Sequence, residues 1–302
     1  MSEINKRVGF YPGCSLNGTA SEYKTSVLSL ANAFGIELEE VPDWNCCGAT
    51  AAHNLNKNLS LALPARVLAN AAEAGMKDIL VPCASCYNRL ALTLHALQDE
   101  SVRAEVEALI AKPLDAGIRV MNMIQFVQEY IQPHLDEKIQ RPFFAKTACY
   151  YGCLLVRPHE VLHFDRTEDP QSMDEVMQTL GVGTIDWPYK TECCGAGLTM
   201  SRTDLVSKLS GNIVADAAER GAQAIVVACP MCHANLDMRG QQSSGKDTAP
   251  IPILYLSQAL GMAIGLDEKQ TGIGHHLTPV KPELLCAKQP EQIVQPEFKK
   301  EV

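Results

Sequence analysis

The apolar positions of the chain fall into short runs that alternate with longer amphipathic segments. The short runs predict buried strands at residues 8–11, 78–81, 143–149 and 224–228. The longer segments, whose apolar residues recur every three or four positions, predict helices at residues 21–34, 59–74, 173–180 and 202–220. Gly35 and Gly181 directly follow two of these helices, where glycine commonly ends a helix. This alternation is typical of an α/β fold with parallel sheets.

The same order of elements occurs twice. Residues 120–130 and 253–263 predict a matching strand and helix that close each half, and Pro133 and Pro142 lie between the halves. The expected fold is therefore α/β, with two pseudo-symmetric halves, each a small sheet flanked by helices.

The expected domain limits follow from this division. We place a first domain at 1–138 and a second at 139–266. From Asp267 onward the chain is rich in proline and lysine and lacks periodicity. Residues 267–302 are therefore expected to form a C-terminal tail, loose or bound to a partner.

Composition excludes several classes of protein. Hydrophobic residues make up 46% of the 302 residues, which is enough for a core in each half. The formal net charge of −9 argues against nucleic acid as a partner. The first ten residues lack the apolar segment of a secretory signal, and the longest apolar tract, 251–265, is too short to span a bilayer. We expect a cytoplasmic protein with no direct membrane span.

Ten of the twelve cysteines form one pattern that is used twice. A single cysteine is followed after 31 or 39 residues by an adjacent pair, and after a further 35 or 34 residues by a C-x-x-C motif. The first set is Cys14, Cys46, Cys47, Cys83 and Cys86. The second set is Cys153, Cys193, Cys194, Cys229 and Cys232. One C-x-x-C motif is a weak signal, but two sets of five in the same order are a strong one.

Residues around the cysteines repeat as well. Asp43-Trp44 precedes the first adjacent pair and Asp186-Trp187 precedes the second, and each pair is followed by Gly-Ala. The second copy is longer because residues 188–192 are inserted before its pair. These matches indicate an internal repeat. Each C-x-x-C motif directly follows a predicted strand, and ligands of parallel sheets lie at the carboxyl ends of strands, so the cysteines of each half should converge.

Five thiols in each half favour metal or redox chemistry over a disulfide scaffold in a reducing compartment. Adjacent cysteines suit one tetrahedral zinc ion poorly because their side chains leave the backbone in different directions. They suit a larger iron–sulfur cluster, which has several attachment points. Iron–sulfur clusters are favoured on these grounds, while zinc or a thiol relay remain alternatives.

The cysteine pattern resembles the CCG domain of the cysteine-rich subunit of heterodisulfide reductases. The resemblance is carried by Cys193-Cys194-Gly195, by the segment from Cys229 to Asp237, and by the opening segment from Tyr11 to Ala20, and it extends over residues 7–265. Tyr150 and Leu154 stand where methanogen members carry histidines. The chain therefore looks more like the bacterial or sulfur-oxidation-type relatives.

The resemblance implies that each set of five cysteines holds one non-cubane [4Fe–4S] cluster, so that all ten are cofactor ligands and carry the catalysis. It implies that a disulfide is reduced to two thiols between the clusters, or that a thiol or sulfur carrier is oxidised in reverse. It also implies partner chains, namely a ferredoxin-like iron–sulfur subunit and a flavin subunit. The sequence contains no C-x2-C-x2-C-x3-C-P run and no G-x-G-x-x-G fingerprint, as expected if those groups lie on other chains.

Three residues outside the cysteine pattern give weaker evidence of function. His233 follows the last ligand and could donate a proton to a leaving thiolate, or only hydrogen-bond to the cluster or the backbone. Cys149 is expected to pack as a small hydrophobic residue, and Cys286 to be a free thiol.

Two other functions are compatible with the sequence. The chain could be an electron-transfer subunit of a lactate, glycolate or fumarate type flavin oxidoreductase. It could also be a zinc-stabilised scaffold protein. The first alternative predicts clusters that do not respond to thiols, and the second predicts bound zinc and no visible chromophore.

Overall fold

The first half of the protein is built on a parallel sheet of four strands. The computed structural model describes residues 6–49, 52–114, 117–241 and 250–287. The strand order is β2–β1–β3–β4. The strands are β1 (Lys6–Phe10), β2 (Ile36–Glu40), β3 (Asp78–Leu80) and β4 (Arg119–Met121). The mixed α/β fold is as predicted, although the sequence pattern did not indicate β2, whose residues alternate only partly between buried and exposed.

The second half repeats this arrangement with one strand fewer. Its sheet is parallel, in the order β5–β6–β7, with strands β5 (Thr147–Tyr150), β6 (Ala224–Val227) and β7 (Ile253–Tyr255). Where the first half has β2, the second half has a single parallel bridge between Thr147 and Thr184. The predicted strand at 143–149 is shorter in the structure, because Phe143 pairs with Cys286 instead of joining the sheet.

In the first half, α2, α4 and α7 lie where the periodicity predicts helices, and four further helices were not predicted from it. The described helices of this half are α1 (Gly13–Leu16), α2 (Ser21–Ala33), α3 (Ala52–Leu55), α4 (Lys57–Glu73), α5 (Ala84–Ala96), α6 (Glu100–Ile110) and α7 (Met123–Phe126). The side chain of Asn56 starts α4 by accepting a hydrogen bond from the Leu59 amide.

The described helices of the second half show the same order. They are α8 (Ser172–Thr179), α9 (Thr203–Glu219), α10 (Pro230–Asn235), α12 (Leu256–Ala263) and α13 (Glu268–Thr271). Helices α5 and α10 each begin directly after the first cysteine of a C-x-x-C motif. None of the helices in the described part of the chain is long and apolar enough to cross a membrane.

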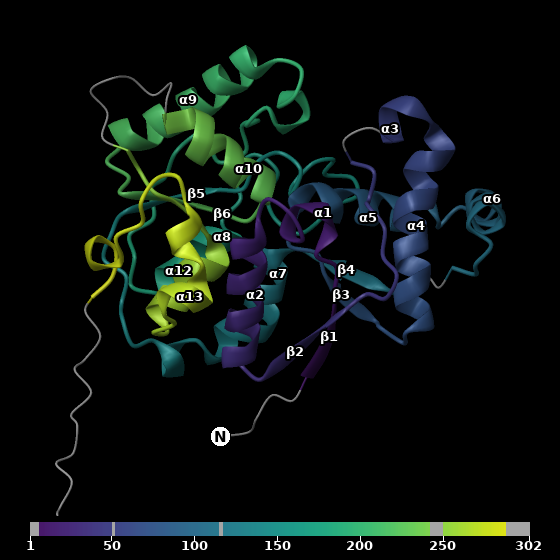
Figure 1. The fold of residues 1–302 in the computed structure, drawn as a ribbon, viewed down its shortest axis with the longest axis horizontal. Coiled ribbons are helices and arrows are strands. Elements are labelled where there is room, and N and C mark those ends of the chain that lie inside the picture. The colour runs from purple at the N-terminus through teal and green to yellow at the C-terminus, as the bar shows by residue number, and fades with distance from the viewer. Residues whose placement is uncertain (1–5, 50–51, 115–116, 242–249, 288–302) are drawn as a thin grey trace, which may run out of the picture.

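The two halves share one continuous apolar core. Helix α2 of the first half lies beside α12 and α13, as Figure 1 shows. The hydroxyls of Ser26 and Ser257 are 2.7 Å apart in this contact, and both are buried. The rings of Tyr23 and Tyr255 stack there with centroids 3.9 Å apart. Packing of α2 against α12 therefore holds the two cysteine sets in a defined relation.

The predicted tail differs from the structure over residues 267–287. Helix α13 packs on α2, and the buried carboxylate of Asp237 accepts hydrogen bonds from the amides of Leu277 and Thr278 at 2.8 and 3.0 Å. These tertiary contacts order a segment that has no periodicity of its own. Residues 288–302 lie outside the described residues.

Candidate functional site

The first cysteine set gathers at the carboxyl edge of the first sheet. Cys14 lies in α1, which follows β1, and Cys83 is the N-cap of α5, which follows β3. The adjacent pair, Cys46 and Cys47, lies between β2 and α3. Because parallel strands share a carboxyl edge, these three loops converge. The Sγ atoms of Cys47 and Cys86 are 3.2 Å apart, so the loops bring thiols from separate parts of the chain into contact.

The second set gathers in the same way. Cys153 follows β5, and Cys229 is the N-cap of α10, directly after β6. The Sγ atoms of Cys194 and Cys232 are 3.6 Å apart, which repeats the contact of the first set. The structure thus brings together cysteines from all three loops in each half, in corresponding pairs.

A buried tyrosine supports each set, a role that was not predicted from the sequence. The Tyr11 hydroxyl donates to the Asn45 carbonyl at 2.8 Å, and the Tyr150 hydroxyl donates to the Glu192 carbonyl at 2.6 Å. Burial raises the pKa of Tyr150, and the four nearby thiols of its own set raise it further. Each tyrosine therefore lies among the thiols and ties down the residue before the adjacent cysteine pair. A signal was present, because both tyrosines precede the single cysteine by three residues.

Substitution of Tyr150 by phenylalanine is expected to lower the free energy of unfolding by about 1 kcal/mol, the net value of one such hydrogen bond. Urea unfolding measured anaerobically checks this value. Tyr189→Phe is the control, because the Tyr189 ring stacks on Trp187 at 6.3 Å and its hydroxyl has no hydrogen bond to a described residue. Equal stabilities of the two variants would contradict the anchoring role of Tyr150.

Glycines leave space beside the thiols. Gly13 and Gly152 have φ angles of +62° and +69°, which residues other than glycine rarely adopt. A Cβ atom on Gly13 would lie 3.1 Å from the Cys86 Sγ, and one on Gly152 would lie 3.1 Å from the Cys232 Sγ. The absence of these side chains keeps the space next to the Cys86 and Cys232 sulfurs open.

Several thiols of the site ionise readily. Hydrogen bonds with Cys46 and then Cys86 hold the pKa of Cys47 far below its usual range. A hydrogen bond with Cys153, helped by the Gly195 amide 3.3 Å from its Sγ, outweighs burial and lowers the pKa of Cys193 to about 6. Thiolates rather than thiols bind metal, so both halves supply donors that are ready at neutral pH.

The two sets meet at a buried junction. Hydrogen bonding with Cys83 helps to lower the pKa of Cys229, second to the effect of Cys232, and the same contact is the largest cause of the raised pKa of Cys83. Both of these thiols are buried, and α1 packs against α10 beside them. Cys14, Cys46 and Cys193 are exposed. The joined site therefore has a closed centre, where the halves touch, and an open rim.

The donor set fits iron–sulfur clusters. Ten thiols, thiolates among them, and glycine-lined space beside the sulfurs match the requirements of cysteine-ligated clusters. No three histidine, cysteine or carboxylate side chains within the described ranges are grouped as ligands of a single metal ion.

His233 lies behind the second set. Its ring stacks on Tyr255 with centroids 4.2 Å apart and meets the edge of His276 at 4.5 Å. Its Nε2 atom is 3.0 Å from the Ile253 carbonyl oxygen, and burial holds its pKa well below the usual value. These contacts match the packed, backbone-bonded alternative, so we leave proton donation by His233 out of the proposed chemistry. His276 lies in the segment predicted as a tail, so its packing on His233 was not expected.

The two cysteines outside the repeat lie outside the site as well. Cys149 is buried in β5, and its carbonyl accepts a hydrogen bond from the Trp187 indole at 3.1 Å. The Cys286 thiol donates to the Pro282 carbonyl at 3.2 Å. Neither thiol contacts a cysteine of the two sets in the described structure.

The insertion at 188–192 places a buried lysine behind the second set. The Lys190 carbonyl accepts hydrogen bonds from the amides of Tyr151 and Gly152, so it holds the turn that precedes Cys153. Its Nζ atom lies 3.1 Å from a carboxylate oxygen of Asp169 and 3.5 Å from one of Asp174, which is also buried. Sequence reasoning missed this lysine, since a lone lysine in a loop is usually exposed.

Substitution of Lys190 by methionine is expected to lower the free energy of unfolding by about 3–5 kcal/mol, because Asp174 would stay buried without its cation. The double variant Lys190→Met/Asp174→Asn should recover part of that loss. Urea unfolding of both variants measures it. If the double variant loses as much free energy of unfolding as the Lys190→Met and Asp174→Asn variants lose together, the two side chains do not form a buried ion pair.

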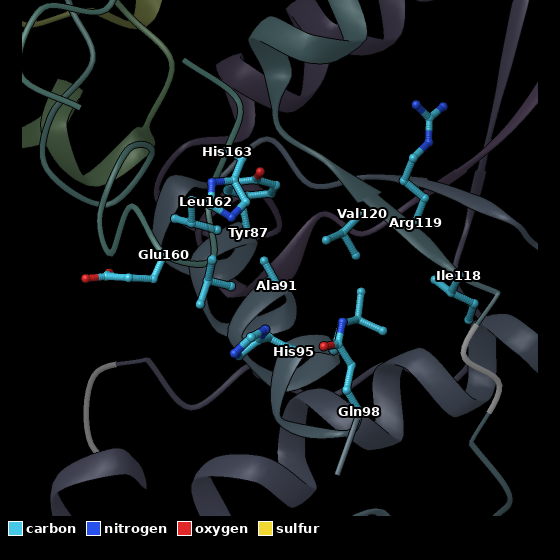
Figure 2. A pocket seen from close by; sticks show the side chains of 12 residues that line it. Tyr87, Ala91, His95, Gln98, Ile118, Arg119, Val120, Glu160, Leu162 and His163 are labelled. Carbon is cyan, nitrogen blue, oxygen red and sulfur yellow. The ribbon is translucent and has the colours of Figure 1, made fainter. Parts of the chain in front are cut away.

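A separate groove of about 520 Å³ runs along the outer side of α5. Figure 2 shows Tyr87, Ala91 and His95 of that helix facing Glu160 and His163. None of the ten cysteines is among the described residues that line it. No sequence motif pointed to this groove, and we assign it no part in the reaction.

Two repeated α/β halves, each with five cysteines at the carboxyl edge of a parallel sheet, define a cysteine-rich protein of the redox or metal-binding class. Comparison with known families agrees with this class. The family model described as "Cysteine-rich domain" (CCG) matches residues 8–91 and 147–237. The chain belongs to the CCG cysteine-rich domain family.

Curated relatives cover nearly the whole chain. The 8-methylmenaquinol:fumarate reductase membrane anchor subunit of Wolinella succinogenes is 28% identical, over 91% of this chain and 98% of the relative. A ferredoxin:CoB-CoM heterodisulfide reductase subunit of Methanosarcina mazei is 30% identical, over 79% of this chain and 82% of the relative. A protein of Archaeoglobus profundus, named as similar to a heterodisulfide reductase subunit, is 29% identical, over 88% and 94%. These relatives support an oxidoreductase role for this chain, as one subunit of a larger complex.

A solved structure shares the fold. The crystal structure of a hypothetical protein from Helicobacter pylori superimposes with a TM-score of 0.75 at 13% identity. The match covers 92% of this chain and 53% of that chain, so this chain spans about half the length of that protein.

Proposed function

We propose that this chain is the catalytic iron–sulfur subunit of a heterodisulfide reductase-like complex. In this proposal each cysteine set holds one non-cubane [4Fe–4S] cluster, and a disulfide is reduced to two thiols between the sets. The reverse reaction, oxidation of a thiol or sulfur carrier, uses the same site.

The observation that carries the proposal is the contact between Cys83 and Cys229. This contact supports the proposal, because the two five-thiol sets then lie beside each other rather than at opposite ends of the molecule. Cleavage of a disulfide takes two electrons, and clusters pass electrons singly. Two adjacent redox centres therefore suit one S–S bond better than two isolated centres do.

The residues of the chain have separate tasks in this scheme. The ten cysteines would hold the clusters, which when bound supply one-electron reduction and an iron site for a substrate sulfur. The exposed rim at Cys14, Cys46 and Cys193 gives the substrate access from solvent. Gly13 and Gly152 leave room beside the ligand sulfurs. The reaction needs two protons, and because the described thiols at the rim are open to water, solvent can supply them.

A second function has a specific observation in its favour. The relative from Wolinella succinogenes, which this chain covers over 98% of its length, is named as a subunit of a fumarate reductase. The alternative proposal is therefore an electron-transfer subunit of a fumarate-type oxidoreductase, with both clusters acting as a relay. The two proposals share the cluster ligands and differ in whether a substrate sulfur binds at them.

The partners we propose are a ferredoxin-like iron–sulfur subunit and a flavin subunit of the same complex. This proposal fits a sequence that contains neither the ferredoxin cysteine run nor a dinucleotide fingerprint. The exposed cysteines at the rim are compatible with delivery of electrons by such partners, because electron transfer requires short distances.

The test begins with iron and acid-labile sulfide on anaerobically purified protein, with about eight irons expected per chain for two four-iron clusters. EPR spectra are then recorded before and after addition of a small thiol or disulfide. Consumption of the disulfide with a reduced viologen as electron donor is followed in parallel. A spectrum that changes on addition, together with disulfide consumption, supports the catalytic proposal.

The other outcomes decide between the alternatives. Clusters whose spectrum ignores both thiol and disulfide favour the electron relay. Zinc in place of iron, after expression with adequate iron, contradicts both redox proposals. The remaining hypothesis is then a zinc-stabilised scaffold protein.

A further inference from the structure

A buried asparagine of the first half holds a turn of the second half. Asn88 lies on α5, two residues after Cys86, and only 2% of it is exposed. Its amide nitrogen donates to the Leu154 carbonyl at 3.1 Å and to the Arg157 carbonyl at 2.8 Å. A side-chain amide has two N–H donors, so this contact uses both of them. The asparagine therefore links the two halves through a pair of hydrogen bonds.

The turn at residues 153–157, which receives these bonds, begins with a proposed cluster ligand. The Cys153 carbonyl accepts a hydrogen bond from the Arg157 amide at 3.2 Å, which closes the turn. Two residues inside the turn, Leu155 and Val156, are buried in the core that both halves share. The asparagine amide thus binds both the start and the end of the turn, so a shift of Cys153 away from the first half would break these bonds.

The second half holds the same turn from its own side. The Lys190 carbonyl accepts hydrogen bonds from the amides of Tyr151 and Gly152, which directly precede Cys153. Cys153 therefore lies between one anchor in its own half and one anchor in the other half. Together the two anchors fix the place of this cysteine relative to the first set.

The repeat provides this link in one direction only. The residue that corresponds to Asn88 is Ala234, which lies two residues after Cys232 and is exposed. An alanine side chain cannot donate a hydrogen bond, and α10 meets α1 of the first half by packing. Asn88 is therefore a feature of the first half that the duplicated pattern does not explain.

We propose that Asn88 is a positioning residue that sets the spacing between the two redox centres, because it holds the Cys153 turn of the second set against the helix that carries Cys86. The inference rests on the proposed function, in which each set holds a cluster. Two centres that share one two-electron reaction need a fixed separation, since a misplacement of about 1 Å can cost about 100-fold in rate. Buried hydrogen bonds resist such a shift, because movement of the turn would leave two buried carbonyls without a partner.

EPR of the full chain tests the proposal, on anaerobically purified protein that is poised so that both centres are paramagnetic. The wild-type spectrum should be split by the magnetic interaction of the two centres, which weakens as their separation grows. Asn88→Leu has a similar volume but no donor, so the turn should move outward and the splitting should become smaller. About eight irons should remain, while viologen-linked disulfide consumption should fall by about 10–100-fold.

Asn70→Leu is the matched control. Asn70 is also 2% exposed, and its amide donates to the Pro42 and Asp43 carbonyls at 3.2 and 2.8 Å, so its bonds stay within the first half. It also accepts a hydrogen bond from Lys112 at 2.7 Å. Asn70→Leu should therefore lower the urea midpoint at least as much as Asn88→Leu does, yet keep the wild-type splitting and rate.

The outcomes separate this inference from the proposed function. Equal splittings in the wild type and Asn88→Leu, or equal losses of splitting in the two leucine variants, overturn the inference while the proposed function stands. An iron-loaded wild type without any splitting does the same. If Asn88→Leu loses its iron, Asn88→Ser decides the question, because serine can keep at most one of the two bonds and should reduce the splitting; an unchanged splitting in Asn88→Ser overturns the inference. Absence of iron from the wild-type protein overturns the inference and the proposed function together.

Discussion

Replacement of Cys194 by alanine is expected to remove about half of the iron from the anaerobically purified protein and to lower disulfide reduction by more than about 100-fold. Cys194 is buried, and its Sγ lies 3.6 Å from that of Cys232, so its replacement removes a thiol from the interior of the set. Outer contacts of metal ligands already cost about 10–100-fold when removed, and loss of a ligand should exceed that range. Iron analysis and the viologen-linked assay measure both effects.

Cys149→Ala is the matched control, because Cys149 is a buried cysteine of the same half that lies outside the set. It should keep all of its iron and most of its activity. Full iron content in Cys194→Ala, or equal losses in the two variants, would show that the second set is not the ligand set we propose.

Gly152→Ala should cost the second half its cluster even though no cysteine is changed. A Cβ atom at this position lies 3.1 Å from the Cys232 Sγ, and the φ angle of +69° adds about 1–2 kcal/mol of backbone strain for a residue other than glycine. The new methyl group pushes on a ligand sulfur, so iron content should fall by about half, as in Cys194→Ala. Iron and sulfide analysis measures the loss, and urea unfolding measures the strain.

Gly221→Ala separates strain from contact. Gly221 has a φ angle of +80° in the same half, and a Cβ atom there meets no atom within 4 Å. This variant should be destabilised by about the same 1–2 kcal/mol yet keep its iron. If Gly221→Ala and Gly152→Ala lose iron equally, the effect is one of general stability, and the open space beside Cys232 has no special role.

Much of the fold followed from local pattern. The helices at α2, α4, α8 and α9 lie within two residues of their predicted limits, because their apolar stripes are long and regular. Strand β2 was missed because its residues are mostly polar and only partly buried. The 267–287 segment was predicted as tail because its order comes from contacts with α2 and Asp237, which leave no local period.

The candidate site, like the fold, could be predicted from the sequence only in part. The grouping of cysteines within each half was predictable, since parallel strands bring their carboxyl ends to one edge. The roles of Tyr11, Tyr150 and Lys190 were not predicted, although the first two repeat in the sequence. A lone tyrosine or lysine becomes informative only when its partners are known, and those partners lie up to 42 residues away.

The sequence by itself therefore determined the family, the two halves and the five thiols offered by each, because all of these are written in spacing and repetition along the chain. Only the tertiary structure decided that Cys83 meets Cys229 and that the segment beginning with α13 packs on α2. The physical reason is that these relations depend on how α2 packs against α12. That packing is set by complementary side chains from distant parts of the chain, such as Tyr23 and Tyr255, and no local pattern records it.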